Sequence, residues 1–329
     1  MAYKHIFFHF INIIFISCIV YFFYQLVYYV KRPTENFTGI GEFKAAPLRG
    51  ADLNSISDAR ISFADSESND DVNNLNTSDN RYVCIYAYYE KNEEYKNNLE
   101  YFLEKGGLQS DIDYYIVVNG KCSVDIPDIS NVRTIYRENK GFDFGGWQHI
   151  IKNYIHRPYD YYICLNSSVR GPYPENKPWL EQFLPLFGKD VKMVGTSINI
   201  FDSEFWVDMK SIYHKDAPYS HIQSMFFILN RESFDFLSEV GFFDDEADLV
   251  ENNNMNHMIL YKEVMMSQLL IRNGWNINCI LPKYRDLDYR EVKYNINPSG
   301  CDPYYRGTYF GGTIQPEEVV FYKSYRLHD

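Results

Sequence analysis

The sequence predicts an α/β domain with a mostly parallel sheet, and two observations carry that prediction. From Arg81 onward, short apolar runs alternate with longer amphipathic segments, which is the pattern of strands separated by crossover helices. The 329-residue chain is 46% hydrophobic and 23% charged, which is the composition of a folded protein with a sizeable core. Ligands of such sheets lie beyond the carboxyl ends of the strands, so chemistry is expected there.

The first predicted element is a membrane anchor in residues 1–32. Residues 6–30 carry no formal charge, and as a helix they would be roughly 37 Å long, enough to cross a hydrocarbon core of about 30 Å. This run is longer than the apolar region of a cleavable signal peptide, and Lys31 and Arg32 follow it instead of small residues, so we interpret it as a signal-anchor. Lys4 nearly balances these two charges, so the positive-inside rule does not decide the orientation.

Residues 33–80 are predicted to form a flexible, acidic stem. They are rich in Asn, Ser, Asp and Glu without apolar periodicity, so they cannot bury enough apolar surface to offset the entropy of ordering. Three basic residues minus nine acidic residues give the stem a charge of -6, half of the -12 of the chain. The acidic balance also argues against nucleic acid as a partner, because such binding depends on Lys and Arg.

The folded domain, residues 81–329, is predicted to begin with alternating strands and helices. Buried strands are expected from apolar runs, and helices from charged amphipathic segments that end near glycines. The expected strands are 82–88, 113–119, 132–136 and 159–165, and the expected helices are 92–105 and 147–156.

Three polar segments follow or flank these elements, and each also has a purely structural interpretation. Residues 138–147, ENKGFDFGGW, hold three glycines that would let a ligand approach the backbone at a helix start, or would simply form a tight turn. Residues 165–172, LNSSVRGP, place polar groups after an apolar strand, or cap it. Residues 261–275 read as a helix with Glu263 in its first turn, where the helix dipole alone would favour a carboxylate.

In their order along the chain, these segments resemble the nucleotide-sugar-dependent glycosyltransferases of the GT-A fold, especially rhamnan synthesis protein F-like and family-two-type polysaccharide enzymes. The resemblance covers about residues 81–326, and it also rests on VGTSI at 194–198, HIQSMFFILNRESFDFL at 221–237 and GFFDD at 241–245. It implies a Rossmann-like GT-A fold, with a mixed, mostly parallel sheet flanked by helices. It also implies transfer of a sugar from a nucleotide-sugar donor to a hydroxyl of a glycan acceptor.

The resemblance implies roles for individual residues. Glu263 would be the general base of an inverting displacement, although a retaining reaction would not need it as the base. The donor-binding residues would be Tyr86, Asn119, Gly141, Asp143, Gly145, Asn166, Ser168, Arg170, Lys323 and Arg326. The acceptor-binding residues would be His221, Gln223, Asp244 and Trp275. His214 and His221 flank the polar loop HKDAPYSH and are expected to be exposed.

The sequence departs from the family at the metal-binding motif. Such enzymes usually carry a DxD motif for Mn²⁺ or Mg²⁺ after the fourth strand, where this chain has Asn166, Ser167 and Ser168. In one alternative, the fixed charges of Arg170, Lys323 and Arg326 neutralise the leaving diphosphate without a metal. In the other, a weak or relocated site holds the metal, with Asp143, Asn166, Ser168, Asp244, Asp245 or the triplet Asp286-Leu-Asp288 as candidates, the last expected to be a solvated turn.

Three further expectations concern the whole protein. The missing DxD motif keeps open a catalytically silent carbohydrate- or nucleotide-sugar-binding module of the same fold. The layout of anchor, stem and domain implies a type II single-pass protein of the Golgi or endoplasmic reticulum with a lumenal catalytic domain. Usage rich in Asn, Ile, Lys and Tyr suggests an AT-rich genome, such as that of a large virus or a protist.

Overall fold

The computed structural model describes residues 81–202, 209–244 and 254–323. The predicted anchor (1–32) and stem (33–80), together with Asp245 and Arg326, lie outside the described residues. Within the described ranges, no helix combines the length and the apolar character needed to cross a membrane.

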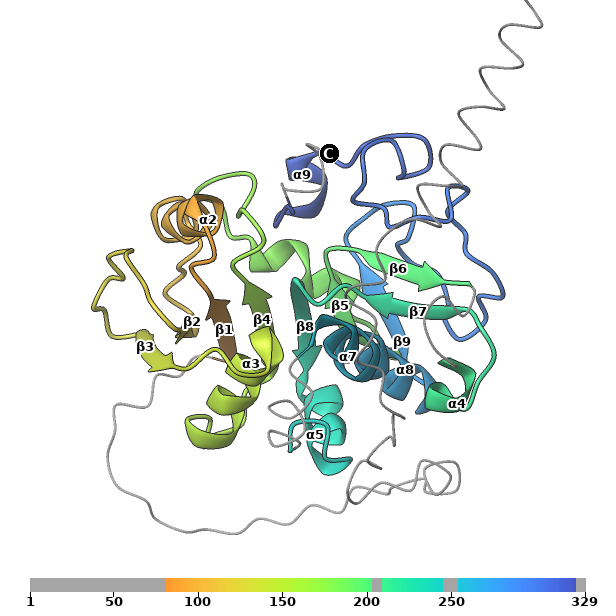
Figure 1. Cartoon of the computed structure of the whole chain (residues 1–329), viewed down its shortest axis with the longest axis horizontal. Helices are drawn as coiled ribbons and strands as arrows, with labels where there is room; N and C mark the ends of the chain where they lie inside the picture. The colour runs from red at the N-terminus through yellow and green to blue at the C-terminus, as the bar shows by residue number, and fades with distance from the viewer. Residues whose placement is uncertain (1–80, 203–208, 245–253, 324–329) are drawn as a thin grey trace, which may run out of the picture. The chain divides into compact units, whose positions relative to one another are not determined.

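The first half of the domain is a set of parallel strands joined by helices. In chain order it contains β1 (Tyr82–Tyr88), α2 (Glu93–Glu104), β2 (Ile112–Asn119), β3 (Val132–Arg137), α3 (Phe142–Asn153) and β4 (Tyr161–Asn166). These strands lie in the order β3-β2-β1-β4 and all pairs are parallel, as Figure 1 shows. The carboxyl ends of all four strands therefore meet at one edge of the sheet.

The second half extends the same sheet. It contains β5 (Val191–Gly195), β6 (Ile198–Phe201), α4 (Met209–Tyr213), β7 (Tyr219–Ile222), β8 (Phe226–Asn230), α5 (Arg231–Glu239), α7 (Met255–Met258), the π-helical segment η4 (Ile259–Val264), α8 (Met265–Arg272), β9 (Asn276–Cys279) and α9 (Pro316–Val319), with two short 3-10 turns at Leu180–Gln182 and Leu184–Leu186. The sheet continues as β4-β8-β5-β9, and β8 is antiparallel to both of its neighbours. Strands β6 and β7 form a separate antiparallel pair.

This architecture confirms the predicted mixed, mostly parallel α/β sheet, and the four predicted strands are present within two residues of their predicted bounds. Two helix starts were predicted wrongly. Helix α3 begins at Phe142 instead of Trp147, so Gly145 and Gly146 lie inside its first turns. The helix that carries Glu263 begins at Met255, so this carboxylate lies in mid-helix and the helix dipole does not explain it.

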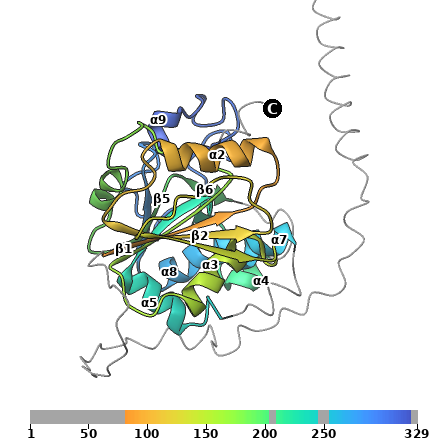
Figure 2. The same cartoon turned by 90° about the vertical axis from the view of Figure 1, so that its left-hand side faces the viewer.

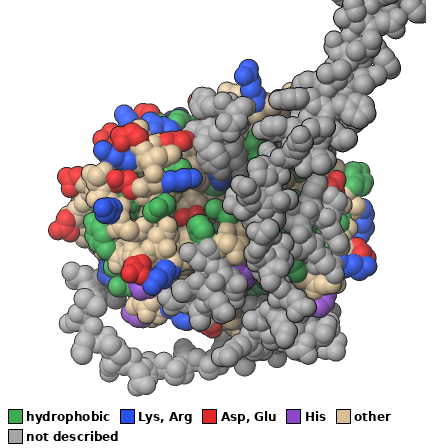
Figure 3. Space-filling model, viewed as in Figure 1, with side chains coloured by type: hydrophobic (Ala, Val, Ile, Leu, Met, Phe, Trp, Pro, Cys, Tyr) green, Lys and Arg blue, Asp and Glu red, His purple; other side chains and the backbone are tan. Residues whose placement is uncertain are grey.

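The helices cover both faces of the sheet. Figure 2 shows the sheet nearly edge-on, with α2 on one side and α3, α5 and α8 on the other. This arrangement follows from right-handed crossovers, because β2 lies on one side of β1 and β4 lies on the other. The surface of α2 is highly charged, and Lys96 lies between Glu93 and Glu100; acidic and basic side chains are interspersed over this part of the molecule in Figure 3.

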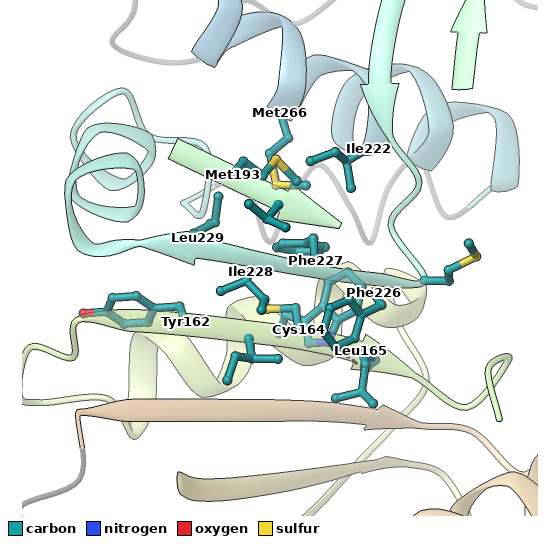
Figure 4. Packing of buried hydrophobic residues seen from close by; sticks show 14 of the residues in the cluster. Tyr162, Cys164, Leu165, Met193, Ile222, Phe226, Phe227, Ile228, Leu229 and Met266 are labelled. Atoms are coloured by element: carbon teal, nitrogen blue, oxygen red, sulfur yellow. Dashed lines mark hydrogen bonds between the residues drawn. The ribbon is translucent and has the colours of Figure 1, made fainter. Parts of the chain in front are cut away.

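The core on both sides of β8 fixes the middle of the sheet. Adjacent strand residues point to opposite faces, so Phe227 meets Trp147 of α3 at a ring distance of 5.2 Å, whereas Phe226 stacks on Phe321 at 4.7 Å. Figure 4 shows Phe226 and Phe227 of β8 between Cys164 and Leu165 of β4 and Met193 of β5. Each fully buried side chain of this size contributes roughly 1.5–3 kcal/mol. The contact of Phe321 therefore anchors the C-terminal segment on the sheet.

Candidate active site

A carboxylate and an amide meet at the carboxyl edge of the sheet. Asn166 ends β4, and its Nδ2 donates a hydrogen bond of 2.7 Å to Oδ2 of Asp143 in the first turn of α3. Burial raises the pKa of Asp143 to about 6, against the opposing effects of Lys323 and of the Asn166 hydrogen bond, and Glu263 raises it further. Asp143 therefore lies within electrostatic reach of charges from two distant parts of the chain.

The start of α3 is held in place by neighbouring strand ends. Arg137 ends β3 and donates to Oδ1 of Asn119 at 2.6 Å and to the Lys140 carbonyl at 2.9 Å. Asn119 is fully buried and its Nδ2 lies 3.4 Å from the Phe142 carbonyl, to which it donates. Gly145 is required here, because a Cβ would lie 2.1 Å from the Lys140 carbonyl oxygen. These contacts place Asp143 beside Asn166.

The C-terminal segment brings Lys323 to the same edge. Arg170 and Tyr322 form an antiparallel bridge, with reciprocal backbone hydrogen bonds of 2.8 Å, and Lys323 follows directly. Burial lowers the pKa of Lys323, while Glu263, Tyr95, Asp143 and Tyr305 oppose that shift. The ammonium group therefore lies in the field of both carboxylates.

Glu263 reaches the site from the π-helical segment. A π-helix inside an α-helix is rare and frequently marks a functional position. Oε2 of Glu263 accepts a hydrogen bond of 2.7 Å from the Ser224 backbone N–H and a second from the Ser224 hydroxyl. Oε1 lies 3.9 Å from Nε2 of His221, and the side chain is 19% exposed. One carboxylate oxygen is thus fixed, while the side chain keeps access to solvent.

The predicted acceptor-binding residues are not all brought to this edge. His221 lies on β7 and is 1% exposed, so the expected exposure of this histidine was wrong, whereas His214 is exposed as expected. Gln223 is close to the site but accepts a hydrogen bond from Ser197 and donates one to Asp302.

Two of the predicted acceptor-binding residues lie at the opposite edge of the sheet. Trp275 directly precedes β9, which runs parallel to β5, so it lies at the amino edge of the parallel strands. Asp244 forms an ion pair of 3.7 Å with Lys152 near the end of α3. These positions separate both residues from Asn166 and Asp143 by the length of the strands.

Two predicted donor-binding side chains face α2. The guanidinium of Arg170 lies 4.0 Å from the ring centroid of Tyr101 and donates to the Asn97 carbonyl. The Tyr86 ring packs on Phe102 at 5.1 Å, and its buried hydroxyl has no hydrogen-bond partner within the described residues. Burial raises the pKa of Tyr86, with smaller contributions from Cys84 and Asp143.

The residues at the expected metal position do not fit Mn²⁺ or Mg²⁺. Oδ1 of Asn166 accepts hydrogen bonds from the backbone N–H and the hydroxyl of Ser168, at 3.0 and 2.6 Å, so the two residues satisfy each other. In the part of the chain that the structure describes, no group of three or more His, Cys, Asp or Glu residues could hold a metal ion. Asp286 and Asp288 lie in an exposed turn, as expected, and Asp288 pairs with Arg290.

Sequence reasoning missed three contributions to this site. Ser224 holds Glu263 although 39 positions separate them, and Arg137 orients the loop before α3. Tyr95 and Tyr305 lie within electrostatic reach of Lys323. Ser224 lies inside the HIQSMFF run, but only the tertiary structure identifies its partner.

Comparisons with known proteins found similarity only to solved structures, and glycosyltransferases are among them. No family model matches the sequence, and no curated protein matches it significantly. The galactosyltransferase LgtC, in complex with donor and acceptor sugar analogs, is 12% identical and aligns over 72% of this chain and 95% of its own, with a TM-score of 0.37. HddC from Yersinia pseudotuberculosis is 14% identical over 46% of this chain and 78% of its own, with a TM-score of 0.28.

A third neighbour is the glycosyltransferase GlyE of Streptococcus pneumoniae TIGR4. It is 10% identical over 56% of this chain and 44% of its own, with a TM-score of 0.30. TM-scores and identities of this size do not transfer an activity from any of these proteins to the chain. We therefore infer the function from the sheet and the site described above.

Proposed function

We propose that the domain is a GT-A-type glycosyltransferase that moves a sugar from a nucleotide-sugar donor to a hydroxyl of a glycan acceptor. The observation that carries this proposal is the convergence of Asp143, Glu263 and Lys323 at the carboxyl edge of the sheet. They come from α3, η4 and the C-terminal segment, so the fold itself assembles them. The finer resemblance to rhamnan synthesis enzymes of polysaccharide formation stays a prediction.

Each of these residues fits a step of an inverting displacement. Glu263, with one oxygen fixed by Ser224, would remove the proton of the acceptor hydroxyl. The acceptor oxygen would then form a bond to the anomeric carbon while the bond from that carbon to the diphosphate breaks. The electron pair would leave with the diphosphate, whose negative charge the Lys323 ammonium would compensate.

Asp143 fits a contact to hydroxyl groups better than a contact to phosphate. Its carboxylate already accepts from Asn166, and a carboxylate repels the charged diphosphate. We assign it to hydroxyls of the donor ribose or sugar. Since the residues at the expected metal position satisfy each other, we propose that transfer needs no divalent cation and that Lys323 supplies the positive charge.

The proposed location of this activity is based on the sequence. We propose a single-pass protein that is anchored through residues 6–30, with the transferase domain on the lumenal side of a Golgi or endoplasmic reticulum membrane. The stem would hold the domain away from the bilayer.

A panel of nucleotide sugars tests the proposal. The fragment 81–329 and its Glu263→Gln variant are incubated with each donor and a mixture of glycan acceptors, with Mn²⁺ or with EDTA. We expect the unmodified fragment to release nucleoside diphosphate in EDTA, and the variant to bind the donor with unchanged affinity but to transfer at least 10²-fold more slowly.

Other outcomes of this panel would contradict parts of the proposal. Binding without turnover in every condition would favour the catalytically silent module. A strict requirement for Mn²⁺ would refute the role of Lys323 as the substitute for a metal. Full activity of the Glu263→Gln variant would remove Glu263 as the base.

A further inference from the structure

His221 presents an unpaired ring nitrogen to the proposed base. Nδ1 lies 3.0 Å from the carbonyl oxygen of Tyr219. A carbonyl only accepts hydrogen bonds, so Nδ1 carries the proton and Nε2 carries a lone pair in the neutral ring. Nε2 has no hydrogen-bond partner among the described residues, the side chain is 1% exposed, and the nearest carboxylate oxygen is Oε1 of Glu263 at 3.9 Å.

Two acceptors therefore face each other in a buried position. An ionised carboxylate cannot donate to Nε2, and a buried acceptor without a donor costs free energy. A carboxylic acid can donate, so with a neutral His221 ring the pair becomes satisfied when Glu263 holds a proton. The 3.9 Å separation is about 1 Å longer than a hydrogen bond, so the proposed contact requires Oε1 to move toward Nε2 when it is protonated.

We propose that His221 is a positioning residue for proton transfer, whose Nε2 accepts a hydrogen bond from Glu263 after Glu263 takes the proton of the acceptor hydroxyl. This inference rests on the proposed function. The O–H bond of the acceptor breaks, the proton binds Oε1, and the new O–H donates to Nε2, so no further reactant is needed. Because the contact exists only as the proton arrives, it stabilises the transition state more than the ground state.

The surroundings of His221 favour the neutral ring over an imidazolium ion pair with Glu263. Burial lowers the pKa of His221, while Glu263 opposes that shift. On the neighbouring strand β6, the Phe201 ring lies 4.7 Å from the His221 ring and gives it an apolar neighbour. Lys323 already compensates part of the charge of Glu263 and Asp143.

A carboxyl titration tests the inference without relying on activity. Glutamate side chains of the full chain in detergent are labelled with ¹³C at the carboxyl carbon, and the Glu263 signal is assigned by its loss in the Glu263→Gln variant. In His221→Phe, which removes the acceptor nitrogen, we expect the titration midpoint of this signal to move about one pH unit lower, because the protonated form loses its partner. In His221→Gln, whose amide oxygen can accept, we expect a smaller shift.

A different result of the titration would indicate an ion pair between a protonated His221 and an ionised Glu263. A midpoint that rises in His221→Phe, or does not move, overturns the proposal. Should His221→Phe fail to fold, the ¹⁵N chemical shift of His221 Nε2 in the unmodified protein provides the test. We expect the shift of an unprotonated nitrogen at pH 7, and an imidazolium signal would overturn the proposal.

Kinetics then link the contact to transfer. We expect His221→Phe to lower kcat about 10-fold, leave KM unchanged and move the acidic limb of the kcat profile by the same amount as the titration. An unmodified fragment that transfers no sugar would refute the proposed function, while the titration would still report on the contact between His221 and Glu263.

Discussion

Asp143 is the residue whose environment most directly predicts a measurable change in stability. Burial raises its pKa from 3.8 to about 6, so the folded state holds this proton more tightly than the unfolded state. Below pH 4 the Asp143 carboxyl is protonated in both states, and its contribution to the free energy of unfolding is fully present. This contribution is lost as the pH rises through the folded-state pKa of about 6. At pH 7 the folded protein therefore carries the cost of an ionised, half-buried carboxylate.

We predict that Asp143→Asn stabilises the domain at pH 7 and removes donor binding. The amide oxygen of the new side chain can still accept from Asn166, while the cost of burying a charge disappears. We expect a gain of roughly 1–2 kcal/mol in the free energy of unfolding at pH 7, less than the full pKa shift implies because the side chain keeps some solvent exposure. Urea denaturation at pH 7 and at pH 4 measures it.

The pH dependence provides the control for this prediction. At pH 4 the native carboxyl is protonated, so the variant and the parent protein should differ by less than about 0.5 kcal/mol. A variant that is less stable than its parent at pH 7 would show that the attraction between Asp143 and Lys323 outweighs the cost of burial.

Individual residues also show which parts of the candidate site could be predicted from the sequence. Asp143 and Asn166 were selected because they flank glycines or end a strand, and Glu263 and Lys323 because the resemblance implies a base on a helix and a basic C-terminal segment. The structure brings all four toward one edge of the sheet. The sequence did not identify Ser224, because its contact with Glu263 depends on how β8 and η4 pack. Trp275 was selected for its aromatic ring beside a glycine turn, but strand direction places it at the other edge.

At the scale of elements, the predicted bounds of strands and helices were most accurate where a continuous run of apolar residues indicated them. The strands β1 to β4 are continuous apolar runs and were located within two residues. The start of α3 was missed because Gly145 and Gly146 were read as a loop, whereas the close approach of the Lys140 carbonyl requires a glycine at position 145 inside the helix. The π-helical segment η4 could not be predicted, because one additional residue per turn leaves no distinct pattern in Ile259–Val264.

The C-terminal segment provides a test at the scale of elements. Gly171 lies against this segment, and a Cβ at this position would lie 2.4 Å from the Val320 carbonyl oxygen and 2.7 Å from Cδ1 of Phe321. The Val320 carbonyl also accepts the hydrogen bond from the Tyr173 N–H. We predict that Gly171→Ala displaces the segment and moves Lys323 away from the carboxylates, so that nucleoside diphosphate binds about 10-fold more weakly, as measured by calorimetry.

A second glycine serves as the matched control. A Cβ on Gly188 would meet no atom within 4 Å, so Gly188→Ala should leave both nucleotide affinity and thermal stability unchanged. Equal nucleotide affinity in the two variants would show that the bridge between Arg170 and Tyr322 does not position the diphosphate site.

At the scale of the whole molecule, the sheet divides the proposed chemistry between its two halves. The parallel strands β1 to β4 end at Asp143 and Asn166, which face the proposed donor. The half that contains the antiparallel strand β8 carries Ser224, His221 and Glu263, which form the proposed base. The -12 charge of the chain says little about this site, because the stem contributes -6 and Lys323 supplies local positive charge.

Within the described residues, the strands and helices of residues 81–323 bury a continuous core, so we expect the domain to fold without the anchor or the stem. We predict that the fragment 81–329 unfolds in one cooperative transition and binds nucleoside diphosphate as tightly as the full chain in detergent.

The full chain should float with membranes after centrifugation, because residues 6–30 carry no charge to oppose insertion, whereas the fragment should stay in the aqueous fraction. If the full chain were also recovered in the aqueous fraction, the anchor would be refuted, and a fragment that binds nucleotide more weakly than the full chain would show that residues 1–80 contribute to the site.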